Sequence, residues 1–246
     1  MRTLVWDGCV NIRDLGGLPT EDGAVTRFGS VVRADNLAGL RAAGRNALLE
    51  YGVTRIVDLR WAEELAEDGP TEVDVEIVHV SLLGEREGPF AEIDRRVRRL
   101  TDPTTRRGSG YVEFVDVFAG NIASAVTAVG QAPEGAVVVH CAGGVDRTGL
   151  VSALLLRLAG VGLRDIGLDY AESERGWAPH VGTWISEAPD EEEREHRQML
   201  SRCPPEAIVR PLERVEQRHG DVRTYLLHAG APAEALDAAR GRLRDD

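Results

Sequence analysis

The chain has 246 residues with 41 acidic and 29 basic side chains, and its formal charge of -12 argues against nucleic-acid binding because a polyanion would be repelled. Its three cysteines, at positions 9, 141 and 203, are odd in number and far apart, which argues against a disulfide framework and favours a reducing compartment. The N-terminus lacks an apolar segment of signal-peptide length and no uncharged stretch is long enough to span a bilayer, so we expect a cytoplasmic protein without stable membrane insertion.

Apolar runs typical of buried strands alternate along the chain with segments of helical periodicity. Strands are predicted over residues 30–33, 55–59, 75–80 and 136–140, and helices over 37–51, 111–129 and 148–159. This alternation is typical of an α/β fold with a central, mostly parallel sheet flanked by helices. Ligands of such sheets bind beyond the carboxyl ends of the strands, which is where Asp58, Arg60 and Cys141 fall.

We interpret the chain as a single domain over residues 1–246 with additions to the core. Residues 84–110 carry an arginine run, which usually forms a solvated helix face and loop; the alternative is a lid whose arginines attract anionic substrates. The acidic residues 187–195 are predicted to be an exposed connection. From there a helical C-terminal region is expected, with short helices over 204–243 separated near Gly220 and Gly230.

The most informative segment is the loop His140 to Gly149, with the sequence His-Cys-Ala-Gly-Gly-Val-Asp-Arg-Thr-Gly, which we call the signature loop. It leaves a predicted buried strand and enters a predicted helix. Such a loop directs several backbone N–H groups and the positive end of the helix dipole at one point, where an oxyanion is stabilised. The backbone of Ala142 to Arg147 is therefore predicted to bind a phosphate group.

Each side chain of the signature loop meets a need of that chemistry. The loop amides, the helix N-terminus and a nearby cation are expected to stabilise a thiolate at Cys141. The planar guanidinium of Arg147 can donate hydrogen bonds to two oxygens of a phosphoryl group. Gly143 and Gly144 let the backbone approach the anion closely. Thr148 is predicted to donate a hydrogen bond to the Cys141 sulfur, and His140 to hold the loop backbone rather than act as a base.

These residues resemble the signature of the protein tyrosine phosphatase superfamily, in which five residues separate Cys from Arg and Ser or Thr follows. More of the chain resembles one branch, the bacterial tyrosine phosphatases that include phosphoinositide-active members. The matching features cover nearly the whole chain: Asn11 to Gly17, Arg33, Val57 to Arg60 with Glu63 and Glu64, the signature loop, Asp169-Tyr170 and Tyr225 to Leu227.

The resemblance implies a two-step phosphomonoesterase without a metal or cofactor. Cys141 would attack phosphorus to form a phosphocysteine that water then hydrolyses, while Arg147 and the loop amides stabilise the charge. A carboxylic acid must protonate the leaving oxygen. Asp58 is the first candidate for this acid because it is predicted to lie at the carboxyl edge of the sheet. The alternative for Asp58 is a structural role, in which it pairs with Arg60 or Arg13. Asp146 is the second candidate for the acid and Asp14 the third. Asn11 and Arg13 are predicted either to buttress the loop or to contact substrate.

One residue departs from that branch, which typically has lysine where this chain has Val145. Because that lysine is associated with reach toward additional phosphates, its absence favours phosphotyrosine in proteins over phosphoinositides. A phosphoinositide or small-molecule phosphatase with the same mechanism, and a phosphate-binding protein with little turnover, are the alternatives. The sequence leaves open the oligomeric state, lid motion and export by a route without a cleaved signal.

Overall fold

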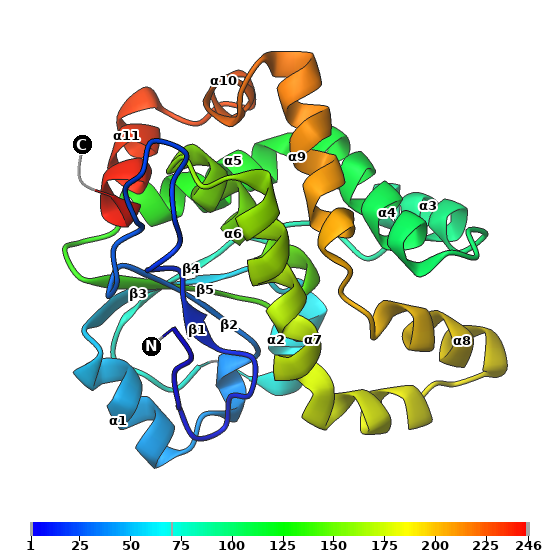
Figure 1. The fold of residues 1–246 in the computed structure, drawn as a ribbon. Helices are drawn as coiled ribbons and strands as arrows, with labels where there is room; N and C mark the ends of the chain where they lie inside the picture. Colours follow the sequence, from blue (N-terminus) through cyan, green and yellow to red (C-terminus); the bar gives the residue numbers. More distant parts are fainter. Residues whose placement is uncertain (1, 70, 245–246) are drawn as a thin grey trace.

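Within residues 2–69 and 71–244, which the computed structural model describes, the chain forms a five-stranded sheet of order β1-β2-β5-β3-β4 (Figure 1). The strands are β1 (Arg13–Asp14), β2 (Val31–Ala34), β3 (Val53–Asp58), β4 (Glu76–His79) and β5 (Ala136–His140). Strand β1 is antiparallel to β2 and the other pairs are parallel. The mostly parallel α/β sheet and its four longer strands are confirmed, whereas the two residues of β1 are too short a run for a sequence pattern to reveal.

The register of the parallel strands gathers polar residues at one edge of the sheet. His140 at the end of β5 lies opposite Ala34 of β2 on one side and opposite Asp58 of β3 on the other. The signature loop begins at this edge, directly after β5. Residues that follow β2 and β3 are therefore the neighbours of the loop, although they lie about 100 residues away in the sequence.

The sheet separates two apolar clusters because alternate strand residues face opposite sides. Val137 and Val139 belong to the larger cluster, which also takes in residues of α5 (Ala119–Gly130), α6 (Asp146–Leu158) and α9 (Pro205–His219). Val138 and Ile56 face the smaller cluster, beneath α1 (Ala42–Glu50). Burial on both faces explains the continuous apolar sequence of β5 from Ala136 to Val139 and the apolar pair Ile56–Val57 of β3.

Two predicted helices are interrupted. The segment 37–51 divides into a 3-10 turn, Leu37–Gly39, and α1. The segment predicted over 111–129 is wrong as one helix, because α4 (Pro103–Val117) ends and α5 begins at Phe118, where the two helices meet at 83°. Phe118 has φ -106° and ψ 25°, and apolar periodicity cannot reveal this bend because the residues on both sides of it still face the core.

The two charged segments singled out in the sequence, 84–110 and 187–195, contribute to helices at one side of the molecule. There α3 (Pro89–Val97), α4 and α8 (Glu191–Leu200) lie together beyond the sheet (Figure 1). The predicted acidic connection is wrong for residues 191–195, which begin α8. Asp190 caps this helix by accepting a hydrogen bond from the Glu193 amide. The acidic residues of the first turn stabilise the helix because they lie at the positive end of its dipole.

The remaining helices are α2 (Ala62–Asp68), α7 (Leu163–Ser186), α10 (Val222–His228) and α11 (Ala233–Leu243). The predicted separations of the C-terminal helices at Gly220 and Gly230 are confirmed, whereas the long α7 was not predicted. In the part of the chain that is described, no single helix combines the length and apolarity needed to cross a membrane, although the bent pair α4 and α5 meets that test together.

Candidate active site

The signature loop turns sharply between β5 and α6, and a glycine at its centre permits this turn. Gly144 has φ +67°, and a Cβ at this position would lie 2.7 Å from the carbonyl oxygen of Ala34. A side chain would thus collide with the end of β2 and also strain the backbone. The close approach holds the loop against the sheet edge.

Four successive carbonyl oxygens of the loop face groups of the surrounding protein. Nδ1 of His140 lies 3.3 Å from the Cys141 oxygen, and the Asn36 amide donates to the Ala142 oxygen at 3.0 Å. Asn11 Nδ2 donates to the Gly143 oxygen at 3.0 Å, and Arg33 Nη2 donates to the Gly144 oxygen at 2.9 Å. His140 and Asn11 thus lie against the loop backbone, and their supporting roles in catalysis stay predictions.

The planar peptide bond converts this carbonyl pattern into an arrangement of donors. Because the N–H of each peptide unit points opposite to its C=O, the amides of residues 142–145 are directed away from those protein groups and toward the mouth of the loop. Among the described residues, none of these four amides has a hydrogen-bond acceptor. They stand at the N-terminus of α6, so the loop is a cluster of positive dipoles suited to an oxyanion.

Cys141 directly precedes these four amides in the chain and is 2 % exposed. Thr148, in the first turn of α6, is also buried, and its hydroxyl lies 3.4 Å from the carbonyl oxygen of Ala34. This hydrogen bond ties α6 to β2 and uses the single hydroxyl proton, so in this structure Thr148 donates to Ala34 and not, as predicted, to the Cys141 sulfur.

Arg147 is fixed by an acidic and an aromatic side chain of the β3–α2 region. Its Nη1 and Nη2 lie 2.5 Å and 2.9 Å from the two carboxylate oxygens of Glu64, and its guanidinium lies 4.3 Å from the ring centre of Trp61. Burial lowers the pKa of Arg147, but the adjacent Cys141 sulfur and Glu64 raise it above its ordinary value. Arg147 is therefore a permanent cation.

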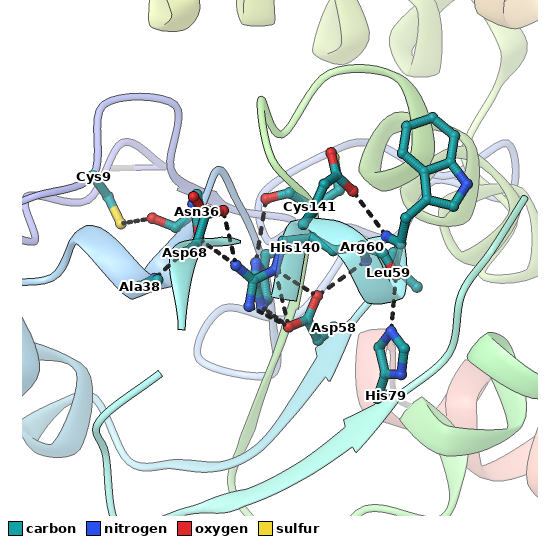
Figure 2. A network of polar contacts seen from close by, with 12 residues as sticks. Cys9, Asn36, Ala38, Asp58, Leu59, Arg60, Asp68, His79, His140 and Cys141 are labelled. Atoms are coloured by element: carbon teal, nitrogen blue, oxygen red, sulfur yellow. Dashed lines mark hydrogen bonds and ion pairs between the residues drawn. The ribbon is translucent and has the colours of Figure 1, made fainter. Parts of the chain in front are cut away.

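Asp58 is a buried ion-pair partner, as Figure 2 shows. Its Oδ2 lies 2.7 Å from Arg60 Nη2 and 3.4 Å from His140 Nε2, and its Oδ1 accepts from the Arg60 amide at 3.0 Å. Burial raises the pKa of Asp58, but the hydrogen bonds from His140 and Arg60 outweigh it and hold the pKa well below its usual range. Asp58 is thus ionised at neutral pH.

Asp146 occupies a different environment in the first turn of α6, where 44 % of its side chain is exposed. Its Oδ1 accepts from Arg107 Nη1 at 2.6 Å and from the Tyr111 hydroxyl at 2.7 Å. Arg107 also donates to the Tyr170 hydroxyl at 2.9 Å. No protein donor to Asp146 Oδ2 is found in the described ranges, which leaves that oxygen available to other partners.

Asp14, the third candidate acid, is engaged in the N-terminal turn. Its oxygens accept from the amides of Gly16 at 2.6 Å and Gly29 at 2.7 Å, and from the Tyr51 hydroxyl. Arg13, its neighbour, is directed to Asp169 of α7 instead. These contacts join the N-terminal segment to the sheet and to α7.

Sequence reasoning assigned no role to several residues of this site. Arg107 and Tyr111 reach Asp146 from α4, and Trp61 and Glu64 reach Arg147 from the region after β3. The family resemblance included both Glu64 and Arg147 but did not predict that they pair. The only signal for Arg107 was the arginine run of 84–110, whose typical interpretation as a solvated face is wrong for Arg106 and Arg107, because both are buried.

The described residues contain no group of three or more His, Cys, Asp or Glu side chains placed to hold a metal ion.

A mostly parallel α/β sheet in which β5 leads through the signature loop directly into α6 is consistent with a protein tyrosine phosphatase-like fold. The model of a tyrosine phosphatase family matches residues 4–245, and the chain belongs to this family. The resemblance noted from the sequence is confirmed. Members of the family are phosphoric monoester hydrolases.

Two bacterial relatives agree with this assignment. The chain is 30% identical over 145 residues to a tyrosine-protein phosphatase of Nostoc commune, a match that covers 58% of this chain and 47% of the relative. It is 28% identical over 203 residues to the triple specificity protein phosphatase PtpB of Mycobacterium tuberculosis, covering 73% of this chain and 72% of the relative. The chain thus spans about half the length of the Nostoc protein and most of the length of the mycobacterial one.

Proposed function

We propose that the protein hydrolyses phosphotyrosine in proteins through a phosphocysteine intermediate. The observation that carries this proposal is the set of four outward carbonyls, residues 141–144, whose peptide units direct their amides to the mouth of the loop above Cys141. Amides fixed before the substrate arrives stabilise the charge of a phosphoryl transition state without reorganising.

The first step transfers the phosphoryl group to the protein. The Cys141 sulfur attacks phosphorus, the bond from phosphorus to the tyrosine oxygen breaks, and that oxygen takes a proton from a carboxylic acid. In the second step, water attacks the phosphocysteine and gives a proton to the carboxylate left by the first step, the sulfur leaves as a thiolate, and inorganic phosphate is released. Arg147 and the loop amides contact the phosphoryl oxygens in both steps, so most of the rate enhancement comes from positioning and electrostatics.

Asp146 is the better candidate for the acid, although the sequence favoured Asp58. A general acid must be able to reach the leaving oxygen of the substrate. Asp58 is buried and both of its carboxylate oxygens accept hydrogen bonds from Arg60, so neither oxygen is free to reach a substrate. Asp146 is partly exposed at the start of α6, and its Oδ2 is available on the described part of the chain.

Two tryptophans beside the loop support a phenolic substrate. Trp61 covers the Arg147 guanidinium, and a Cβ built on Gly143 would lie 3.6 Å from the indole of Trp177 in α7. Aromatic side chains next to a phosphate site favour an aryl leaving group by edge or face contacts. Val145 is buried and brings no cation to the loop, which disfavours substrates with several phosphates.

A substrate panel tests this proposal. Wild-type protein is given phosphotyrosine peptides, phosphoinositides and small phosphomonoesters, with Cys141→Ser as the matched control. We expect the highest kcat/KM for the peptides and no turnover by the variant. Faster hydrolysis of phosphoinositides or small phosphomonoesters would overturn the substrate assignment. A wild-type protein that binds phosphate without hydrolysing any of the three would overturn the enzymatic function.

A further inference from the structure

A buried carboxylate on α7 holds together a group of arginines behind the signature loop. Asp169 is 2 % exposed. Its Oδ1 lies 3.0 Å from Arg13 Nε, its Oδ2 lies 2.7 Å from Arg33 Nη1, and Arg2 also pairs with it. Burial raises the pKa of Asp169, but the three guanidinium groups outweigh it and hold the pKa well below its usual range. The carboxylate is therefore ionised.

Two of these arginines extend from Asp169 to the loop. Arg33 uses Nη1 for the carboxylate and Nη2 for the Gly144 oxygen at 2.9 Å. Arg13 acts through a second side chain: its Nη1 donates to Asn11 Oδ1 at 3.1 Å, and Asn11 Nδ2 donates to the Gly143 oxygen at 3.0 Å. Two of the four outward carbonyls thus depend on groups bound to Asp169.

Arg13 and Arg33 repel each other, so a nearby negative charge is needed to hold both in these positions. Arg13 and Arg33 both contact the Ser173 hydroxyl, at 3.0 Å and 3.1 Å, which brings their like charges close together. Burial and the neighbouring Arg33 lower the pKa of Arg13 to about 10. A negative charge between them offsets the repulsion, and Asp169 supplies that charge.

We propose that Asp169 is a positioning residue for phosphoryl transfer, which orients the Gly144 and Val145 amides toward the phosphoryl oxygens by fixing Arg33 and, through Arg13, Asn11. This inference rests on the proposed function of the loop. The peptide unit that contains the Gly143 oxygen also contains the Gly144 amide, and the unit that contains the Gly144 oxygen contains the Val145 amide. When either carbonyl loses its donor, its peptide unit is free to rotate and the amide no longer points at the anion.

The first test is Asp169→Asn, which keeps the size of the side chain and removes its charge. Loss of a single preorganised donor to a developing oxyanion lowers kcat by about 100-fold, and we expect a loss of about 10- to 100-fold here. Orthovanadate mimics the transition state, so its inhibition constant should rise by a similar factor. The KM for p-nitrophenyl phosphate should change by less than about threefold, because ground-state binding depends less on the aligned amides.

Glu172→Gln is the matched control. Glu172 lies on the same helix, 3.4 Å from Arg2 and 3.9 Å from Arg13, but no contact joins it to Arg33 in the described structure. The substitution removes the same charge from the same region without releasing the Gly144 oxygen. We expect wild-type kcat and vanadate inhibition from this variant. Equal losses in both variants would indicate a general electrostatic effect and overturn the positioning role.

Ser173→Ala decides the matter if Asp169→Asn fails to fold, as judged by circular dichroism. It removes only the hydroxyl shared by Arg13 and Arg33, and we expect kcat and vanadate affinity to fall together by about 3- to 10-fold. The inference is overturned if Asp169→Asn folds and keeps wild-type kcat and vanadate affinity. If Asp169→Asn does not fold, the same result from a folded Ser173→Ala overturns it. A wild-type protein without turnover overturns the proposed function instead, so the two failures are distinguishable.

Discussion

Arg147 and Glu64 form a two-pronged ion pair at the signature loop, with nitrogen–oxygen distances of 2.5 Å and 2.9 Å. Burial raises the pKa of Glu64, but the hydrogen bonds from Arg147 outweigh it and lower the pKa. The carboxylate occupies one edge of the guanidinium and Trp61 one of its faces. This arrangement fixes the orientation of the cation before a substrate arrives, which reduces the entropic cost of forming the transition state.

Glu64→Gln should therefore lower kcat by about 10-fold or more, because the amide holds the guanidinium in place less strongly and accepts only one of its two hydrogen bonds. Steady-state kinetics with p-nitrophenyl phosphate measure this effect. The adjacent Glu63 is exposed, and Glu63→Gln serves as the control with the same loss of charge. Wild-type kcat in Glu64→Gln would contradict the positioning of Arg147 by this pair.

The assignment of the acid predicts a different dependence on the leaving group for two variants. Asp146→Asn should slow hydrolysis of phosphotyrosine, which has a poor leaving group, by about 100-fold and hydrolysis of p-nitrophenyl phosphate by less, because a good leaving group needs a proton less. Asp58→Asn should slow both substrates by similar factors. Steady-state kinetics with the two substrates measure this difference. The opposite pattern would restore Asp58 as the acid, and similar factors for both substrates in both variants would reject both residues.

Asp58→Asn should instead affect stability. Removing this carboxylate leaves the buried Arg60 with the partly exposed Asp68 as its remaining ion-pair partner, and it should cost about 3 kcal/mol. Because folding depresses the pKa of Asp58, its contribution is complete above its ordinary value of 3.8 and is lost as the pH falls toward the folded value. Urea denaturation at pH 7 and at pH 3 measures this, and the gap between variant and wild type should narrow at pH 3. A constant gap would contradict the linkage.

A second pH dependence belongs to His196, where α8 meets α4. Arg106 donates to its Nδ1 at 3.0 Å, Asp94 lies 3.8 Å from its Nε2, and Arg98 and Glu193 lie nearby. Burial and Arg98 lower its pKa from 6.5 to about 4. The folded chain therefore disfavours protonation, so stability should fall as the pH drops from about 6.5 to about 4, by roughly 2 kcal/mol.

Thermal melting of wild type and His196→Gln between pH 7 and pH 4 measures that change. The variant keeps a polar group beside Arg106 but does not titrate, so its melting temperature should vary less over this interval. Identical pH dependence in the two proteins would show that His196 does not carry the effect.

The signature loop was predictable because its chemistry is local. Cys141, Arg147 and the intervening glycines lie within one short segment, and the flanking strand and helix have clear apolar patterns. The sheet was predictable for a similar reason, since strands buried on both faces are continuously apolar.

The rest of the site arises from contacts between distant segments, which one sequence does not reveal. Arg107 contacts Asp146 across 39 positions, and Asp169 contacts Arg33 across 136. Both arginines are buried charges that a composition pattern assigns to the surface, and only their partners make burial tolerable. The bend at Phe118 was missed because a change of helix direction leaves the apolar periodicity intact.

The central claim, that Cys141 carries the phosphoryl group, is tested most directly by trapping the intermediate. Wild-type protein is mixed with p-nitrophenyl phosphate, quenched with acid within milliseconds and analysed by mass spectrometry of its peptides, with Cys141→Ser as the control. We predict a single phosphoryl group on the peptide that contains Cys141, together with a burst of p-nitrophenol, and neither in the variant. Turnover by Cys141→Ser, or a phosphoryl group on another residue, would contradict the account.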